Sequence, residues 1–423
     1  MTLSPSDHYV VISSDGHAGA PIREYKQYLE RRWHDEFDAW AAAFADPWAD
    51  LEEDSDHKPG VASADSTFSW DSAKRQAALE SDGIVGEVLF PNTAPPFFPA
   101  GVFTVAAPTT RAEYERRWAG LRAHNRWLVD FCAEAPGRRA GCAQVFLNDV
   151  DDTLAEIRWL KEAGLTGGIL LPGDAPSQLV PLYYPAYDPI WALCQELEVP
   201  VHRHANLPGE AASPAVGPAG PAVGILESHF FAHRALGHLI FAGVFERFPR
   251  LRFVITEAGT GWAPGYLRKL DEFYEAGLVK GSVNAYFLEE SVNALPRRPS
   301  EYFATNVWIG ASFLTAPEAA KRAAIGVDRI MWGADLPHLE GTYPFSREAI
   351  RAALCDVPPD EVAAILGTTA ADIYSFDLAT LQPVADTFGP TVAEVATPLL
   401  DPPSFPDVTA TAPLNPAVMT RSR

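Results

Sequence analysis

The sequence has few cysteines and no long uninterrupted apolar run, and both absences narrow its class. Its 423 residues include 4 cysteines, which are scattered without the spacing of a metal site or a disulfide framework. No stretch approaches the roughly 18 consecutive apolar residues that would span a membrane. The first residues also lack the basic start and apolar core of a signal peptide. We therefore expect a soluble, cytoplasmic protein with free thiols.

Basic residues are scarce relative to acidic ones. The chain has 33 Lys and Arg against 55 Asp and Glu, which gives a formal net charge of −22. This excess argues against nucleic acid or an anionic membrane as a partner and leaves a small-molecule substrate. A hydrophobic content of 47% is ample for a large core, either as one large domain with extensions or as two ordinary domains.

Short apolar, β-branched runs recur along the chain with helical spacing between them. Several runs are nearly continuous, as in parallel strands that are covered on both faces. The predicted strands are Tyr9–Ser14, Gly83–Phe90, Arg139–Phe146, Gly167–Leu171, Val199–His204, Leu251–Thr256, Asn306–Gly310 and Arg329–Gly333. The predicted helices are Arg111–Ala135, Asp151–Ala163, Ile190–Leu197, Ser228–Phe248, Ala316–Ile325 and Ser346–Leu354.

Strands that alternate with helices predict an α/β fold, specifically a (β/α)8 TIM barrel. An open doubly wound sheet is the alternative, but no Gly-rich dinucleotide fingerprint follows the first strand. We place the barrel at residues 8–375, with insertions at about 33–73 and 205–227, followed by a proline-rich C-terminal tail at 376–423. The second insertion would lie at the barrel mouth, where a lid or a subunit contact would explain so long a loop.

Polar side chains follow four of the predicted strands where the strands end. They are Asp15 with His17, His202 with His204, Glu257, and Asp335 with His338. In a barrel the C-terminal ends of the strands converge on one mouth, so these distant residues would meet there. Buried carboxylates and imidazoles are costly without a partner, and one divalent cation would satisfy them together. The pattern therefore indicates a metalloenzyme.

These groups also have structural interpretations. Asp15 would satisfy backbone amides in a turn, and Asp335 would cap the next helix. Pro337 breaks the chain before any helix starts, however, which favours a ligand or a general base at Asp335. Glu257 is balanced between a metal ligand and a structural ion pair. Of the two strand histidines, His204 is favoured as a ligand because it lies nearer the mouth.

Three further residues carry open alternatives. Glu87 is a charge inside an apolar run, so it either meets an arginine or reaches the metal. His233 lies in a helical pattern, where it packs against the barrel or lines the mouth. Arg203 is a candidate for gripping a substrate carboxylate. No Gly-x-Ser-x-Gly elbow is present, which disfavours a serine nucleophile.

Four stretches carry a family resemblance: Ser14-Asp15-Gly16-His17, Pro200-Val201-His202-Arg203-His204, Gly243-Val244-Phe245-Glu246-Arg247-Phe248-Pro249-Arg250-Leu251, and Trp332-Gly333-Ala334-Asp335-Leu336-Pro337-His338. They resemble the amidohydrolase superfamily, and within it the group of aminocarboxymuconate-semialdehyde decarboxylase and the resorcylate-type decarboxylases. The resemblance covers about residues 8 to 375. It implies a (β/α)8 barrel with one divalent ion, zinc or manganese.

By position, the resemblance assigns Asp15 and His17 to the first-strand pair of ligands, His204 to the fifth-strand histidine and Asp335 to the eighth-strand aspartate. One departure stands out, since relatives often carry a histidine after the sixth strand where this chain has Glu257. Extra ligands at Glu87, Glu257 and His202 would suit a second metal. Some barrels of this type resemble such a centre and act as dinuclear iron or manganese oxygenases.

The leading hypothesis is a metal-dependent hydrolase or non-oxidative decarboxylase acting on a small carboxylated or carbonyl substrate. Asp335, Glu257 and His338 are the expected catalytic residues, with Arg203 and His233 binding substrate. The metal ligands are expected among Asp15, His17, His202, His204, Asp335, Glu257 and Glu87. The alternatives are a dinuclear oxygenase, with iron in place of zinc or manganese, and an inactive partner subunit. We expect a homodimer.

Overall fold

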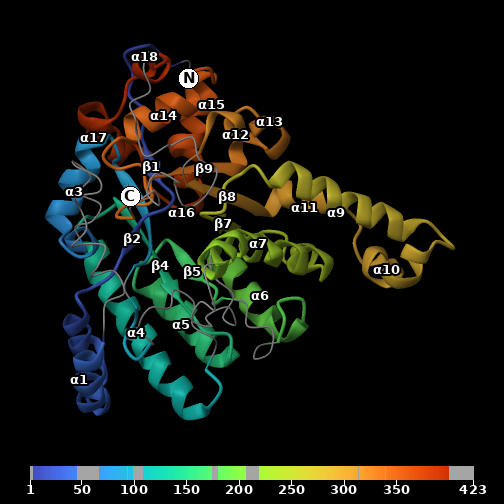
Figure 1. Cartoon of the computed structure of the whole chain (residues 1–423), viewed down its shortest axis with the longest axis horizontal. Helices are drawn as coiled ribbons and strands as arrows, with labels where there is room; N and C mark the ends of the chain where they lie inside the picture. The colour runs from blue at the N-terminus through green and yellow to red at the C-terminus, as the bar shows by residue number, and fades with distance from the viewer. Residues whose placement is uncertain are drawn as a thin grey trace.

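The computed structural model describes residues 3–44, 66–92, 94–98, 108–173, 180–205, 219–312, 314–338 and 340–399. Most of the two expected insertions lies outside these ranges. The described residues form a nearly closed parallel barrel with helices around it (Figure 1). Among them, no helix combines the length and the apolar character needed to span a membrane.

The barrel is built from short strands that pair in parallel throughout the described chain. Their order is β1-β3-β4-β5-β6-β7-β8-β9, with β2 paired to β3. Their bounds are β1 Ile12–Ser13, β2 His17–Ala18, β3 Gly86–Pro91, β4 Arg139–Gln144, β5 Gly168–Leu170, β6 Val201–His204, β7 Phe253–Thr256, β8 Val307–Ser312 and β9 Ile330–Gly333. The predicted strands and the (β/α)8 barrel are confirmed.

The two ends of the sheet meet beside the first predicted strand, whose C-terminal side continues into β2. The Ser14 amide donates to the Trp332 carbonyl at 2.8 Å, and the His17 amide donates to the Leu336 carbonyl at 2.7 Å. Every residue of β6 to β9 is buried, because the strands are covered by the barrel interior on one face and by helices on the other.

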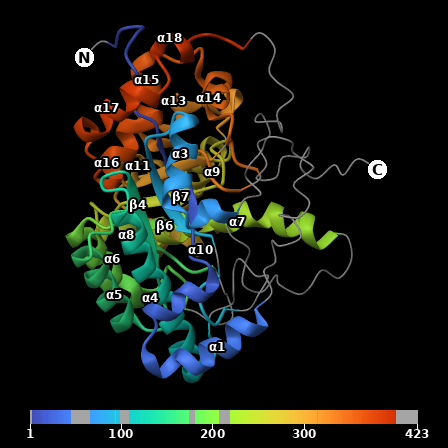
Figure 2. The same cartoon turned by 90° about the vertical axis from the view of Figure 1, so that its left-hand side faces the viewer.

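Helices cover the outside of the barrel, as the two views in Figure 1 and Figure 2 show. Side-chain oxygens of Asp71, Thr110 and Asp149 cap three of them at the N-terminus, as sequence patterns predict. The helices are α1 His34–Ala43, α3 Ser72–Ser81, α4 Arg111–Ala133, α5 Val150–Glu162, α6 Asp188–Leu197, α7 Ala219–Phe241, α8 Val244–Arg247, α9 Ala263–Leu278, α10 Val283–Asn293, α11 Pro299–Asn306, α12 Ala316–Ala319, α13 Arg322–Ile325, α14 Ser346–Leu354, α15 Pro359–Ala363, α16 Thr369–Tyr374, α17 Leu378–Phe388 and α18 Val392–Val395.

Two predicted helices are divided in the structure, and three helices lack a sequence prediction. The predicted helix Ser228–Phe248 ends as α7 and restarts as α8 because Gly243 adopts a left-handed φ of 66° between them. The predicted helix Ala316–Ile325 is likewise split into α12 and α13. Helices α9, α10 and α11 fill the stretch between β7 and β8, for which no helix was predicted.

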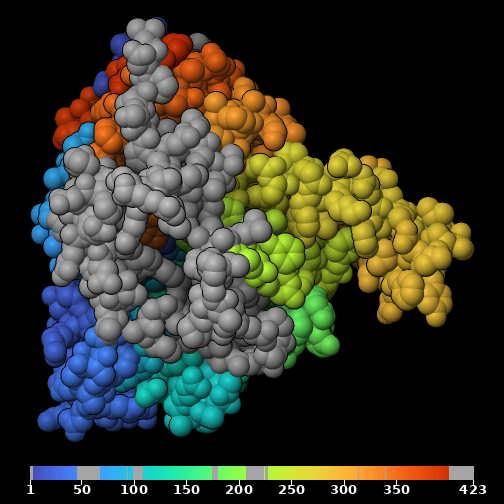
Figure 3. All heavy atoms as spheres, viewed as in Figure 1, coloured from blue at the N-terminus to red at the C-terminus, as the bar shows by residue number. Residues whose placement is uncertain are grey.

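Helices α9 and α10 form a hairpin that projects from the body, at the right of Figure 1 and Figure 3. Its apolar side chains are unusually exposed for a monomer surface, with Val283 75%, Tyr286 83% and Phe287 74% exposed. At the other end of the chain, α17 and α18 pack onto the barrel, burying Leu381 and Val395.

A π-helical turn, η8 (Ala364–Thr368), packs with α16 against the end of the barrel opposite the mouth, touching β1 and β9. Gly367 permits this approach because it has no side chain. A Cβ atom added at Gly367 would lie 2.2 Å from the backbone carbonyl oxygen of Val10, far inside van der Waals contact. The closed end of the barrel therefore depends on this glycine.

Gly367→Ala should lower the free energy of unfolding by at least about 2 kcal/mol, because the backbone of the first strand must move to admit the methyl group. Gly265→Ala is the matched control. Gly265 lies exposed in α9 with open space around it, so alanine there should stabilise the protein by about 0.5–1 kcal/mol. Urea unfolding of both variants measures the difference, and equal effects would contradict the packing argument.

Candidate metal centre

The four ligands expected from separate strands converge at the C-terminal mouth of the barrel. His17 Nε2 lies 3.4 Å from Asp15 Oδ1 and 3.0 Å from Asp335 Oδ1. His204 Nε2 lies 3.2 Å from the same Asp15 oxygen. All four side chains are buried. Residues that are hundreds of positions apart in the sequence therefore share one small volume, as the barrel predicts.

Three more residues extend this group. His204 Nδ1 lies 3.2 Å from Glu257 Oε2, and His338 Nδ1 lies 2.9 Å from Asp335 Oδ1. Glu340 joins Glu257, Asp335 and His338, with one ligand atom from each lying within 4.8 Å of the others. Sequence reasoning missed Glu340. Its only signal was its place in the same loop as Asp335 and His338.

The histidines have the hydrogen-bond pattern of metal ligands. His17 places Nδ1 3.0 Å from the Pro91 carbonyl, and His204 places Nδ1 3.1 Å from the Ala205 carbonyl. A carbonyl only accepts, so the proton of each ring lies on Nδ1 and Nε2 presents a lone pair to the carboxylates. Ligating histidines in metal sites usually donate their second N–H in this way.

The backbone at two of the ligands is strained. Glu257 has a φ of 57° and Asp335 a φ of 59°, directly after β7 and β9. Residues with side chains rarely adopt this left-handed conformation, which costs on the order of 1–3 kcal/mol and gathers at functional sites. The Asp335 amide donates to the Asp15 carbonyl at 2.9 Å, which fixes the two ligand-bearing loops to one another.

The polar atoms at the centre lack hydrogen-bond partners among the described residues. Both carboxylate oxygens of Asp335, which is fully buried, have none, nor does His17 Nε2. A buried carboxylate without donors is costly, and a lone pair aimed at a carboxylate is repelled by it. A divalent cation among Asp15, His17, His204 and Asp335 would remove both costs, so the residues fit such an ion.

The pKa shifts point to the same need for positive charge. Burial raises the pKa of Glu257 well above its ordinary value, and the neighbouring carboxylates of Asp335 and Asp15 raise it further. Burial alone would lower the pKa of His17, but its contacts with Asp15 and Asp335 outweigh burial and raise that pKa to about 10. The carboxylates therefore attract any cation that the mouth admits.

Glu87 lies outside the cluster, and the alternative of an arginine partner is the one the structure has. Arg75 Nη2 donates to Glu87 Oε2 at 2.7 Å, and Arg139 Nε donates to Oε1 at 3.2 Å. The physical reason is depth. Glu87 pairs with Ser13 in the sheet register, below the level at which His17 pairs with Phe90. The expectation that Glu87 binds metal is therefore corrected to a buried ion pair.

His202 is also absent from the cluster. It points to the same side of β6 as His204 but lies one step deeper, where Nε2 is 2.8 Å from the Gly167 carbonyl. Its ring stacks on Tyr374, with centroids 5.6 Å apart and planes at 15°. Burial lowers the pKa of His202 to about 3, so it is neutral. It is a core histidine rather than a ligand in this structure.

The two expected substrate-binding residues do not contact the cluster in the described part of the chain. Alternation along β6 places Arg203 on the face opposite His202 and His204, where its guanidinium donates to the Pro172 carbonyl. His233 stacks on Trp262, with centroids 4.4 Å apart and planes at 21°. Its substrate role stays a prediction.

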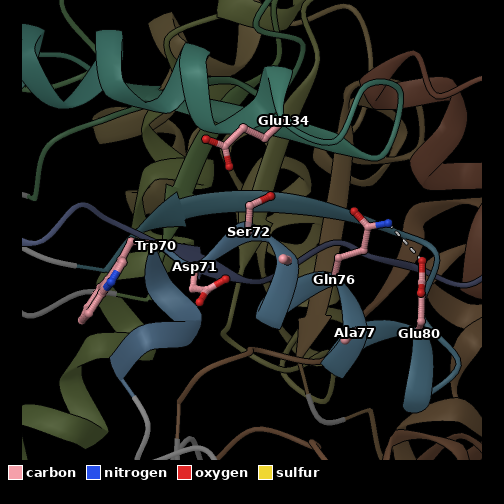
Figure 4. Close-up of a pocket in the computed structure, with 8 residues that line it drawn as sticks. Trp70, Asp71, Ser72, Gln76, Ala77, Glu80 and Glu134 are labelled. Atoms are coloured by element: carbon pink, nitrogen blue, oxygen red, sulfur yellow. Dashed lines mark hydrogen bonds between the residues drawn. The ribbon is translucent and has the colours of Figure 1, made fainter.

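A surface hollow of about 680 Å³ lies elsewhere, over the N-terminus of α3 and the C-terminus of α4 (Figure 4). It contains none of the seven residues at the barrel mouth. The residues that line it are Trp70, Asp71, Ser72, Ala73, Gln76, Ala77, Glu80 and Glu134. Its walls are open and it holds no cluster of metal ligands, so the chemistry belongs to the mouth.

A parallel barrel whose strand ends bring together aspartate and histidine ligands defines a metal-dependent barrel enzyme. The family model of Amidohydrolase matches residues 70–376, more than half of the chain, and the chain belongs to the amidohydrolase family. The resemblance seen in the sequence is therefore confirmed.

Relatives within this family are named as decarboxylases of aromatic acids. The gamma-resorcylate decarboxylase of Rhodococcus jostii is 29% identical over 259 residues, or 56% of this chain and 72% of that protein. An amidohydrolase from Mycobacterium avium subsp. paratuberculosis matches with a TM-score of 0.62 and 21% identity, over 86% of this chain and 99% of the other.

A solved 5-carboxyvanillate decarboxylase from Novosphingobium aromaticivorans has the same fold. It matches with a TM-score of 0.59 and 20% identity, over 88% of this chain and 98% of the other, and it was solved with manganese and 4-hydroxy-3-methoxy-5-nitrobenzoic acid. An enzyme of the amidohydrolase superfamily, with relatives that are metal-dependent decarboxylases, is what the sequence predicted.

Glu87→Gln should lower the free energy of unfolding by about 3–5 kcal/mol, because it leaves two buried guanidinium groups without their counter-charge. The metal bound per folded chain should stay unchanged, as measured by elemental analysis. The control is Glu272→Gln, an exposed partner of Arg268, which should change stability by less than about 1 kcal/mol. Loss of metal from folded Glu87→Gln would restore Glu87 as a ligand.

Proposed function

We propose that this chain is a metal-dependent, non-oxidative decarboxylase of an aromatic carboxylic acid. The observation that carries the proposal is Asp335, a fully buried carboxylate whose two oxygens lack hydrogen-bond donors while His17 and His338 lie within 3.0 Å of it. The named activities of the relatives support the reaction class and the type of substrate.

Asp15, His17, His204 and Asp335 would hold the ion, which we propose to be manganese or zinc. Nitrogen and carboxylate oxygen donors suit both metals. When bound, the ion would act as a Lewis acid on substrate oxygens. The side chain of Ser312 donates to Asp15 and holds that carboxylate in place.

Asp335 would move the proton that the reaction needs. Decarboxylation replaces the bond between the ring carbon and the carboxylate carbon with a C–H bond. The proton passes from the Asp335 carboxyl to the ring carbon, the C–C bond then breaks, its electron pair returns to the ring, and CO₂ leaves. A carboxyl group surrounded by carboxylates and buried from water is suited to this role.

His338 would return the proton to Asp335. Its Nδ1 faces Asp335 Oδ1 at 2.9 Å, and its Nε2 lies 3.1 Å from Asn92 Oδ1. Asn92 Nδ2 in turn donates to Ser69 Oγ, which fixes the amide so that its oxygen faces the histidine. His338 is the most exposed histidine of the cluster, with 20% of its side chain exposed, and it connects the buried carboxyl with solvent.

The dinuclear oxygenase is the second candidate, and one observation favours it. Glu257 stands where relatives resemble one another in carrying a histidine, and it lies beside a further acid, Glu340. Decarboxylation yields CO₂ without consuming oxygen, whereas an oxygenase consumes O₂ with its substrate. Oxygen uptake during turnover therefore separates the two.

Asp335→Asn should lower kcat for decarboxylation at least about 100-fold, because an amide cannot deliver a proton. CO₂ release from gamma-resorcylate and 5-carboxyvanillate measures turnover, and circular dichroism checks the fold. Asp328→Asn, at an exposed aspartate, is the control and should keep full activity. Undiminished turnover by folded Asp335→Asn would eliminate Asp335 as the proton donor.

We also propose that the chain forms a homodimer through the α9–α10 hairpin, whose apolar tip lies far from the barrel (Figure 3). Light scattering should give about twice the chain mass of 46.0 kDa. Replacing Tyr286 and Phe287 together by Ser should yield the monomer mass, because a stable interface needs its buried aromatic anchors. Replacing the half-exposed Tyr183 and Tyr184 by Ser is the control, and dissociation by both pairs alike would refute this interface.

A further inference from the structure

We propose that Glu257, Asp335, His338 and Glu340 hold a second divalent cation beside the first. These residues come from the loops after β7 and β9. One ligand atom from each lies within 4.8 Å of the others, which is the spread expected of donors around a common ion. The sequence had pointed to Glu87, His202 and Glu257 for a second metal, and the structure retains only Glu257 of these.

The number of donors exceeds what one ion takes. Three overlapping groups share residues: the first holds Asp15, His17, His204 and Glu257, the second His17, Asp335 and His338, and the third the proposed site. Together they contain seven side chains with nitrogen or carboxylate oxygen donors. Zinc is usually four-coordinate in proteins, and octahedral ions take about six ligands. Two ions divide the set without leaving a donor idle.

The charges lead to the same conclusion. Four of the seven residues are carboxylates, and their ion pairs in the described part of the chain are with histidines only. One divalent ion would leave two negative charges of the four at a site screened from water. Two divalent ions would balance all four, which is the arrangement that burial favours.

Asp335 is built to serve both ions. Its side chain is fully buried, and neither of its oxygens has a hydrogen-bond partner among the described residues. Oδ1 faces both His17 Nε2 at 3.0 Å and His338 Nδ1 at 2.9 Å. A carboxylate in this position can bridge two ions about 3.5–4 Å apart, as in known two-metal sites.

His338 supplies the independent observation. Asn92 Oδ1 accepts from Nε2, so the neutral ring has its lone pair on Nδ1, aimed at the carboxylate of Asp335. A lone pair does not approach a carboxylate at 2.9 Å unless something positive lies between them. That something is either a proton, as the decarboxylase requires, or the second cation. A two-ion centre is also the form that the oxygenase candidate needs.

The inference shares the first cation site with the proposed function, because Asp335 belongs to both groups. The experiment loads the full chain with Mn²⁺ after chelator treatment and dialysis, then measures the metal per folded chain. Electron paramagnetic resonance is recorded on the same samples. Two Mn²⁺ ions this close are magnetically coupled, and a single ion is not.

The wild type should bind two Mn²⁺ ions per chain with a coupled spectrum. Glu340→Gln should bind the second ion at least tenfold more weakly and show the spectrum of an isolated ion, because Glu340 belongs to the second group alone. Glu289→Gln changes an exposed glutamate of α10 and should bind both ions like the wild type.

One Mn²⁺ per wild-type chain at saturation, or two coupled ions in folded Glu340→Gln, would overturn the second site and leave the proposed decarboxylase intact. No bound Mn²⁺ at all would overturn the first site as well, and with it the proposed function. The wild-type stoichiometry decides the matter even if the variant fails to fold.

Discussion

Repulsion among buried carboxylates is the constraint on which the site of this protein depends. Asp15, Asp335 and Glu257 meet at the barrel mouth, with only histidines as ion-pair partners among the described residues. Such a cluster is unfavourable by itself, since each charge loses its hydration and gains a neighbour of like sign. It is maintained because the fold brings the strand ends together and because the carboxylates share a strong affinity for cations.

The surrounding structure supports this cluster through Arg75. Its guanidinium donates to the His17 carbonyl at 2.8 Å and to the Leu336 carbonyl at 3.2 Å, so it joins the two loops that carry His17 and Asp335. Arg75 is itself held by Glu87. The glutamate that was expected to bind metal thus acts one step removed, by neutralising the arginine that positions the ligand loops.

The family and the site together restrict the chemistry without determining the reaction. Membership of the amidohydrolase family and relatives named as decarboxylases agree with a centre of aspartate and histidine ligands. Glu257 and Glu340 add negative charge at the point where proton transfer or a second ion would be placed. The occupant of the space between Asp335 and His338, a proton or a metal ion, is the physical difference between the two candidate functions.

The barrel and four of its ligands were predictable because their signals are local. Apolar runs mark strands, and Asp15, His17, His204 and Asp335 follow such runs. Depth and direction were not local. The register of β3 places Glu87 below the mouth, and the geometry of β6 gives His202 to the core and turns Arg203 away. Glu340 carried no pattern of its own, because its role arises only when the loop after β9 folds back over Asp335. Strand patterns depend on neighbours in the sequence, whereas which side chains share an ion depends on distances that only the closed barrel sets.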